Sequence, residues 1–280
     1  MKINISKLLV STNKLVEILN NYEQIYNNFY REIENVKNYW YYYHSNNFFS
    51  SMVEEKKENM IFFEEFKSIV DIYSYIVDKY QYIGNNIEFY LNKKDDFFVK
   101  MDNCITSIDN IINSCSSLDS KFFVEVNKKL LDEKNKLLSI KESNKKCISE
   151  IEEFERQVSL KIFKINIMKF NKNNYNNDSL GDIDNKYMDF DNVGIIIKKL
   201  QFNLEEEEIN YEDTNKIFNS INYFYNTTNK SNLDDLIMQI LYKFKSIINI
   251  HKNRISILEL NKNNYQNAYS IVNNFFGEEP

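Results

Sequence analysis

Hydrophobic side chains recur every seven residues from the start of the chain to Trp40, its only tryptophan. The first ladder holds Ile5, Thr12, Leu19, Tyr26, Ile33 and Trp40. The second ladder lies three residues further on and holds Leu8, Leu15, Tyr22, Phe29 and Val36. Two ladders at this spacing form the a/d seam of one long amphipathic helix. A short polar segment follows Trp40, and a second apolar pattern opens at Phe48, so the pattern predicts a helical hairpin.

The same pattern returns five times. Further long helices are predicted over residues 47–91, 98–115, 123–158, 193–225 and 237–272. The three polar turns inside the hairpins are alike, since Trp40, Cys115 and Tyr225 precede Phe49, Phe123 and Leu233 by nine, eight and eight residues. We therefore divide the chain into a first hairpin (1–92), a second hairpin (93–163), a polar linker (164–192) and a third hairpin with its tail (193–280).

Composition supports an all-α fold. The chain has four glycines and a single proline, which is its last residue, Pro280. Nothing therefore breaks the helices, and the turn chemistry of a many-stranded sheet is lacking. We predict an elongated antiparallel bundle of long helices, or coiled-coil hairpins. In this prediction the first two hairpins pack as a four-helix bundle, and the third, attached through the linker, is left to find a partner.

Charge and hydropathy exclude several classes of protein. The net charge is −6, and a nucleic-acid-binding protein needs a basic face, so no nucleic-acid partner is expected. No run approaches the ~18 consecutive apolar residues of a membrane span, so no integral membrane segment is expected. The N-terminal residues lack the apolar run of a signal peptide. The protein is expected to be cytoplasmic, or secreted without a signal peptide.

Candidate catalytic or metal-binding residues are few, and we predict a non-enzymatic protein without cofactor or metal. His44 falls in the first turn and is expected to be exposed, whereas His251 lies on an apolar stripe and is expected to be a core histidine. The acidic segment from Asp182 to Asp191 lacks the glycine and closing glutamate of a calcium loop, which indicates a solvated linker. The cysteines are expected to be buried, inert thiols, and they are Cys104, Cys115 and Cys147.

An aromatic cluster at the first turn is the surface feature with most binding potential. Its members are Tyr39, Trp40, Tyr41, Tyr42 and Tyr43. Successive helical residues diverge by 100°, so these rings cannot all point into one core. Exposed Tyr and Trp are favoured at protein interfaces. Two interpretations stay open: the cluster binds a protein, or it plugs the end of the bundle.

A long helix with tryptophan at its tip and a second long helix within the first 100 residues resembles the WXG100 superfamily. These are helical-hairpin proteins exported by type VII (ESX-like) secretion systems. Here Tyr41 and Tyr42 follow the tryptophan, without the glycine of the Trp-x-Gly tip. The family's export signal is Tyr-x-x-x-Asp/Glu. At the C-terminus Tyr269 precedes Asn273 by four residues, and Phe275 precedes Glu279, which keeps the acid.

The resemblance implies a substrate, partner or targeting factor of a type VII-like system. Such a protein would act by helix-face recognition of the secretion machinery or of a cognate effector or helical hairpin, as a homo- or hetero-oligomer. It also implies that Tyr269, Phe275 and Glu279 contact a protein partner. The alternative is a cytoplasmic coiled-coil scaffold or structural assembly protein, whose seams serve only assembly.

Overall fold

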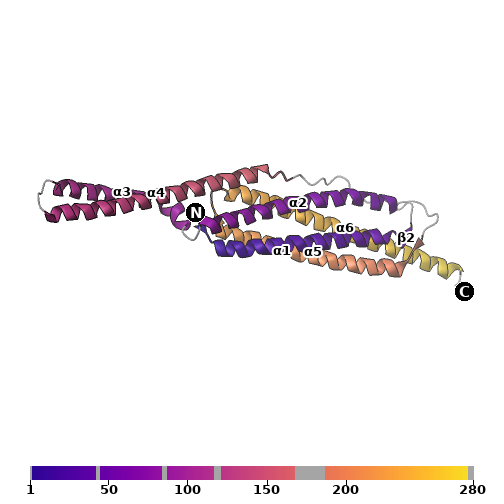
Figure 1. Cartoon of the computed structure of the whole chain (residues 1–280). Coiled ribbons are helices and arrows are strands. Elements are labelled where there is room, and N and C mark those ends of the chain that lie inside the picture. The colour runs from indigo at the N-terminus through magenta and orange to yellow at the C-terminus, as the bar shows by residue number, and fades with distance from the viewer. Residues whose placement is uncertain (1, 42–44, 84–86, 117–120, 168–186, 277–280) are drawn as a thin grey trace.

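A computed structural model describes residues 2–41, 45–83, 87–116, 121–167 and 187–276. It contains six long helices: α1 (Ile5–Val36), α2 (Ser45–Ile83), α3 (Ile87–Cys115), α4 (Lys121–Lys164), α5 (Phe190–Phe224) and α6 (Lys230–Phe276). The all-α class predicted from the sequence is confirmed. The molecule is elongated, with α3 and α4 projecting from one end of a bundle of the other four helices (Figure 1). None of the described helices is long and apolar enough to cross a membrane.

The bundle is a closed ring of antiparallel neighbours. Helix α1 packs against α2 and α5, and α6 completes the ring by packing against the same two helices. The prediction that the first two hairpins form the bundle was wrong, because the first hairpin packs with the third. The physical reason is that α1 and α2 are apolar enough to cover two neighbours each, whereas Met101 is the only buried hydrophobic residue of α3 among those described. Periodicity shows which face is apolar, but not which helix covers it.

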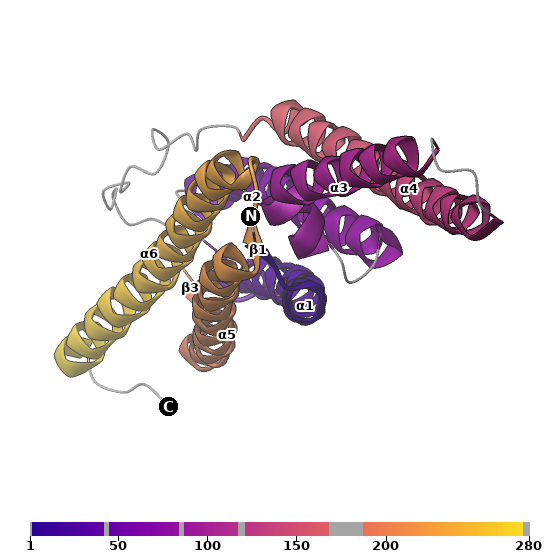
Figure 2. The ribbon, with the colours of Figure 1, turned by 90° about the vertical axis from the view of Figure 1, so that its left-hand side faces the viewer.

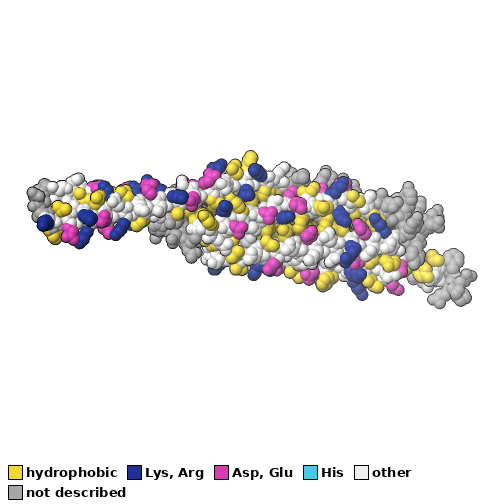
Figure 3. Space-filling view, viewed as in Figure 1, with side chains coloured by type: hydrophobic (Ala, Val, Ile, Leu, Met, Phe, Trp, Pro, Cys, Tyr) yellow, Lys and Arg dark blue, Asp and Glu magenta, His cyan; other side chains and the backbone are white. Residues whose placement is uncertain are grey.

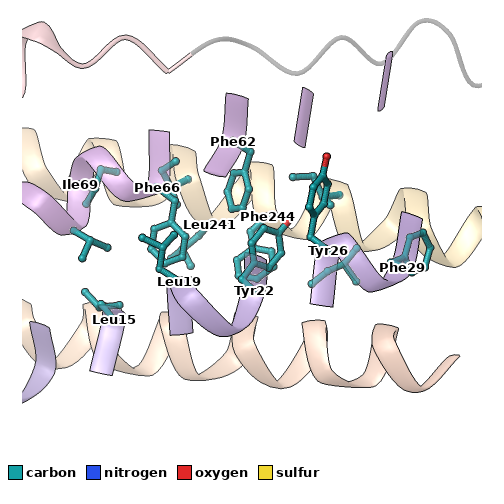
Figure 4. Packing of buried hydrophobic residues seen from close by; sticks show 14 of the residues in the cluster. Leu15, Leu19, Tyr22, Tyr26, Phe29, Phe62, Phe66, Ile69, Leu241 and Phe244 are labelled. Carbon is teal, nitrogen blue, oxygen red and sulfur yellow. The ribbon is translucent and has the colours of Figure 1, made fainter. Parts of the chain in front are cut away.

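Aromatic rings fill the centre of the bundle. Tyr22 of α1, Phe62 of α2 and Phe244 of α6 meet with ring centroids 5.4, 4.9 and 5.3 Å apart. Figure 4 shows these rings between the helices, with Leu19 and Phe66 alongside. All three rings are 0 % exposed. Burial of large apolar side chains at the ladder positions is therefore the main stabilising contribution.

Two short strand pairs close the ends of the bundle. Strand β1 (Lys2–Ile3) pairs with β4 (Tyr225–Asn226), with Ile3 opposite Tyr225. Strand β2 (Trp40–Tyr41) pairs with β3 (Tyr187–Met188), with Trp40 opposite Met188. The backbone N–H of Asp189 donates to the carbonyl of Tyr39 at 2.9 Å and extends the second pair. Each pair fastens one chain segment to the turn of another hairpin.

Helix α4 belongs to two parts of the molecule. Its first part pairs with α3 in a projecting hairpin, the arm (described residues 87–116 and 121–150), and its last part packs on α2. The buried residues of that last part are Ile151, Phe154, Glu155, Val158 and Ile162. Viewed from the arm end, α3 and α4 lie on the side of α2, away from α5 and α6 (Figure 2).

The end of α4 also serves the connection to α5. Helices α2 and α5 are both antiparallel to α1 and therefore run in the same direction, so the chain must travel back along the bundle between them. The last part of α4 makes the first part of this return, running antiparallel to α2 to Lys164. Of the predicted linker 164–192, residues 168–186 lie outside the described residues, and α5 begins at Phe190.

Candidate functional site: buried polar clusters and the projecting arm

A histidine–glutamate pair lies in the middle of the bundle. His251 of α6 and Glu207 of α5 are both 0 % exposed, and Nδ1 of the histidine lies 2.7 Å from Oε2 of the glutamate. The imidazole stacks on Phe29 with ring centroids 3.9 Å apart. Its Nε2 lies 3.3 Å from Nδ2 of Asn59, which donates to the hydroxyl of Tyr30 at 2.8 Å. The imidazole that satisfies these partners donates from Nδ1 and accepts at Nε2. The expected core histidine is thus observed.

Arg254 forms a buried ion pair one turn further along α6. Its Nε donates to Oε1 of Glu55 at 2.7 Å, and its Nη1 donates to the carbonyl of Phe48 at 3.4 Å. The guanidinium also lies over the ring of Phe48, 4.9 Å from the centroid. A third pair joins Lys243 of α6 to Glu65 of α2 at 2.7 Å. Helix α6 thus carries three side chains, Lys243, His251 and Arg254, whose nitrogen atoms meet acids of α2 and α5.

Glu155 of α4 forms the joint between the arm and the bundle. Its carboxylate accepts hydrogen bonds from the hydroxyls of Tyr80 and Tyr225 and, at 2.8 Å, from Nδ2 of Asn229. The same Nδ2 donates to the backbone carbonyl of Glu155 at 2.9 Å. Burial and the adjacent Glu155 raise the pKa values of Tyr80 and Tyr225, so both phenols stay protonated and donate.

These clusters are enclosed by the helices that form them. With His251 and Glu207 fully buried, no solute reaches the pair unless the bundle opens. Within the described part of the chain, no three His, Cys, Asp or Glu side chains converge to hold a metal ion. The arrangement fixes the positions of the helices: Glu207, Glu55 and Glu65 each meet a nitrogen donor of α6, and Glu155 of α4 meets donors from other parts of the bundle.

The arm presents a different surface. Its seam is closed by ion pairs from Lys134 to Asp109 and from Lys141 to Asp102. The large hydrophobic residues exposed on its described part are Val99, Ile111, Phe122, Val124, Leu131, Leu138 and Ile140. Three of them, Val124, Leu131 and Leu138, recur at intervals of seven and so share one face of α4. Hydrophobic side chains are scattered along the arm in Figure 3.

The aromatic cluster of the first turn is divided by the structure. Trp40 is 4 % exposed and packs against Phe48 and Phe49, with ring centroids 5.6 and 6.2 Å away. Tyr39 is half-buried against the core. The side chain of Tyr41, and the whole of Tyr42 and Tyr43, lie outside the described residues. In the described part, Trp40 and Tyr39 occupy the end of the bundle.

The C-terminal candidates lie at the end of α6, which extends past the bundle in Figure 1. Tyr269 is 61 % exposed, with its ring 6.3 Å from that of Phe190, and Phe275 is 82 % exposed. Glu279 lies outside the described residues, as does His44 in the first turn.

The structure bears only in part on the expectations for the acidic linker segment and for the cysteines. Of the acidic linker segment, Asp182 and Asp184 lie outside the described residues, whereas Asp189 caps α5 by accepting from the N–H of Asn192 at 3.0 Å. The prediction of buried thiols was wrong for Cys104, which is exposed; Cys115 and Cys147 are partly buried. In the arm α3 packs mainly against α4, which leaves the rest of its surface, with Cys104, exposed to solvent.

Sequence reasoning missed most of the buried charges. A run of four glutamates such as Glu205–Glu208 is typical of a solvated helix face, yet Glu207 is fully buried. The position of Glu207 in the seven-residue repeat indicates this burial. It belongs to the same ladder as four residues that are all 0 % exposed, Val193, Leu200, Thr214 and Ile221.

Comparisons with models of protein families, with curated proteins and with solved structures found no match for this chain.

Proposed function

We propose that this chain is a non-catalytic recognition protein whose α3–α4 arm binds a helical protein partner. The observation that carries the proposal is the exposed ladder of Val124, Leu131 and Leu138 on an arm that projects from the bundle. Exposed apolar side chains that share one helix face are typical of helix-in-groove and coiled-coil recognition. The four-helix bundle serves as the rigid base that holds the arm.

A narrower proposal keeps the resemblance to type VII secretion proteins. It is supported by the antiparallel α1–α2 hairpin with Trp40 in its connection, and by the exposed end of α6 that carries Tyr269 and Phe275. In this proposal the secretion machinery recognises and binds the end of α6. The alternative, a cytoplasmic scaffold, is favoured by three exposed apolar residues of α5 that recur every seven positions, Ile195, Phe202 and Ile209.

The arm proposal is tested by cross-linking in the cells of origin. A photoreactive residue at Leu138 should capture a partner, and Leu131→Asp in the same chain should abolish the cross-link because it places a charge in the centre of the ladder. Leu160→Asp is the matched control: Leu160 is also on α4 and is 48 % exposed, but it lies outside the arm. Equal capture by both variants would contradict the proposal.

The secretion proposal is tested by removing residues 266–280. Of these, the described side chains are exposed or half-buried, so the truncated chain should fold. Loss of export with unchanged intracellular abundance would support the proposal. Unchanged localisation would favour the scaffold.

A further inference from the structure

An apolar stripe runs along the outward face of α5. Its members are Ile195, Phe202, Ile209 and Tyr223, which are 53, 61, 53 and 80 % exposed. They are spaced by seven, except that Lys216 occupies the step before Tyr223. A groove of about 400 Å³ lies beside Ile195 and Phe202, and its far wall is formed by Asn28 and Arg31 of α1. From Ile195 to Ile209 the stripe is apolar at every step, and an apolar stripe on a helix that already covers the core with its other face indicates a second packing surface.

The charges beside the stripe change sign at Phe202. Lys198 and Lys199 lie before it, and Glu205 and Glu206 lie after it. Lys198 and Glu205 are exposed, and Glu206 is half-buried. Lys199 is 56 % exposed while it holds Glu32 at 3.3 Å. Residues three and four positions apart share a helix face, so all four charges border the stripe.

We propose that this stripe is the seam of a homodimer in which two α5 helices pack antiparallel, with Phe202 of each copy at the two-fold axis. In this register Ile195 lies opposite Ile209 of the second copy. Lys198 then lies opposite Glu205 of the second copy, and Lys199 opposite its Glu206. The two-fold axis repeats each pair, which gives four ion pairs around one apolar strip.

The order of charges selects this register over the others. Parallel pairing in register places lysine against lysine and glutamate against glutamate. Antiparallel pairing centred on Ile209 places Glu205 against Glu212 of the second copy, and Glu206 against its Asp213. Both arrangements are repulsive. The proposed register has one unfavourable pair, Glu212 with Asp191 of the second copy. This pair lies beyond the ends of the stripe, where two helices that cross at an angle are no longer in contact.

The size of the contact sets the strength of the dimer. From Ile195 to Ile209 the stripe spans about 21 Å of helix at a rise of 1.5 Å per residue. A contact between two helices of that length, widened by the α1 groove, falls at the small end of specific interfaces. We therefore expect a dissociation constant in the micromolar range.

The first test is sedimentation equilibrium of the full chain from low to high micromolar concentration. The wild type should convert from monomer to dimer. Phe202→Asp should leave it monomeric, since two charges then meet at the axis. Tyr223→Asp is the matched control, because Tyr223 is more exposed but lies outside the proposed contact. Circular dichroism should be the same for all three proteins.

The second test exchanges the charges. Lys198→Glu alone should weaken the dimer about tenfold, because two like-charge pairs replace two ion pairs. Glu205→Lys alone should weaken it to a similar extent. An equimolar mixture of the two variants should restore association, since every opposed pair then has opposite signs. Raising the salt concentration should reduce the differences.

Three results would overturn the proposal. One is a monomer at every concentration, which includes the case of a stripe that receives the helix of a different protein. Another is a dimer that survives Phe202→Asp, which places the interface elsewhere, as on the arm. The third is a mixture of charge variants that associates no better than either variant alone.

Discussion

Glu155 and Asn229 are joined twice although 74 residues separate them: one amide nitrogen donates both to the carboxylate and to the backbone carbonyl of the glutamate. Glu155 lies on the helix that carries the arm, and Asn229 lies in the turn between α5 and α6. Tyr80 of α2 donates to the same carboxylate. The joint thus gathers two segments of the bundle, α2 and the α5–α6 turn, around one side chain of the arm helix.

Replacing Glu155 by alanine should loosen this joint. The donors of Tyr80, Tyr225 and Asn229 would be left without their acceptor, and we expect the free energy of unfolding to fall by about 2–4 kcal/mol. Amide exchange should quicken over residues 151–162 and stay unchanged in the centre of α6. Glu150→Ala, an exposed change on the same helix, is the control and should have little effect. Equal effects of the two variants would show that the joint is not stabilising.

Removing Glu207, the acid that bonds to His251, should lower the free energy of unfolding more than Glu155→Ala does. Glu207→Ala leaves a buried imidazole without its acceptor and opens a cavity, and we expect a loss of about 3–5 kcal/mol in urea unfolding. The double change Glu207→Leu with His251→Phe should recover much of that loss, because Asn59 and Tyr30 still bond to each other at 2.8 Å. Glu212→Ala, an exposed change on the same helix beyond the proposed dimer contact, is the control. A double variant no more stable than Glu207→Ala would contradict this account.

Buried tyrosines should make the protein unstable at high pH. Burial, with nearby carboxylates in most cases, raises the pKa values of Tyr22, Tyr30, Tyr73, Tyr80 and Tyr225 above the usual 10. Above pH 10 the unfolded chain loses these protons and the folded chain keeps them. Stability from these groups is therefore full below pH 10 and falls as the pH rises further.

The ionisation of the tyrosines can be followed directly by the absorbance of tyrosinate as the pH is raised. The five buried phenols should ionise only as the helical circular dichroism is lost, because unfolding is what brings their pKa values back to the usual 10. Full titration of all twenty tyrosines with the helices intact would contradict the prediction.

Trp40 should act as a natural reporter of the β2–β3 closure. It is buried, it is the only tryptophan, and its indole Nε1 has no hydrogen-bond partner among the described residues. Its fluorescence should be blue-shifted in the folded protein and resist quenching by iodide. Trp40→Ala should cost about 3–5 kcal/mol through the cavity it leaves, and Trp40→Phe about 1.5 kcal/mol or less. Efficient quenching in the folded state would contradict this placement.

The sequence predicted the long helices well and their partners poorly. Seven-residue ladders such as Ile237, Phe244 and Leu258 follow from the geometry of one helix, so they can be identified locally. The choice between α5 and α3 as neighbours of α1 depends on how much apolar surface each helix can bury, a property of the whole assembly. The strand pair of Trp40 with Met188 joins residues 148 positions apart, and two residues carry no periodic signal.

The buried charges could have been found by one further step. Glu55 stands seven residues from both Phe48 and Phe62, and Arg254 stands seven residues after Ile247. A charge in register with an apolar ladder must enter the core, and it needs a counterpart at the same level of another helix. What could not be predicted is which acid meets which base, since that requires the order of helices in the ring.

The continuity of α4 makes the molecule a lever. Residues 121–151 of this helix extend about 45 Å from the tip of the arm to the joint, with no break between them. A load applied at the tip by a bound partner is therefore transmitted as torque to Glu155, the fulcrum, where tyrosines from two other segments hold the helix. For this reason, binding of a partner at the far end of the arm and packing of the bundle around Glu155 are mechanically coupled.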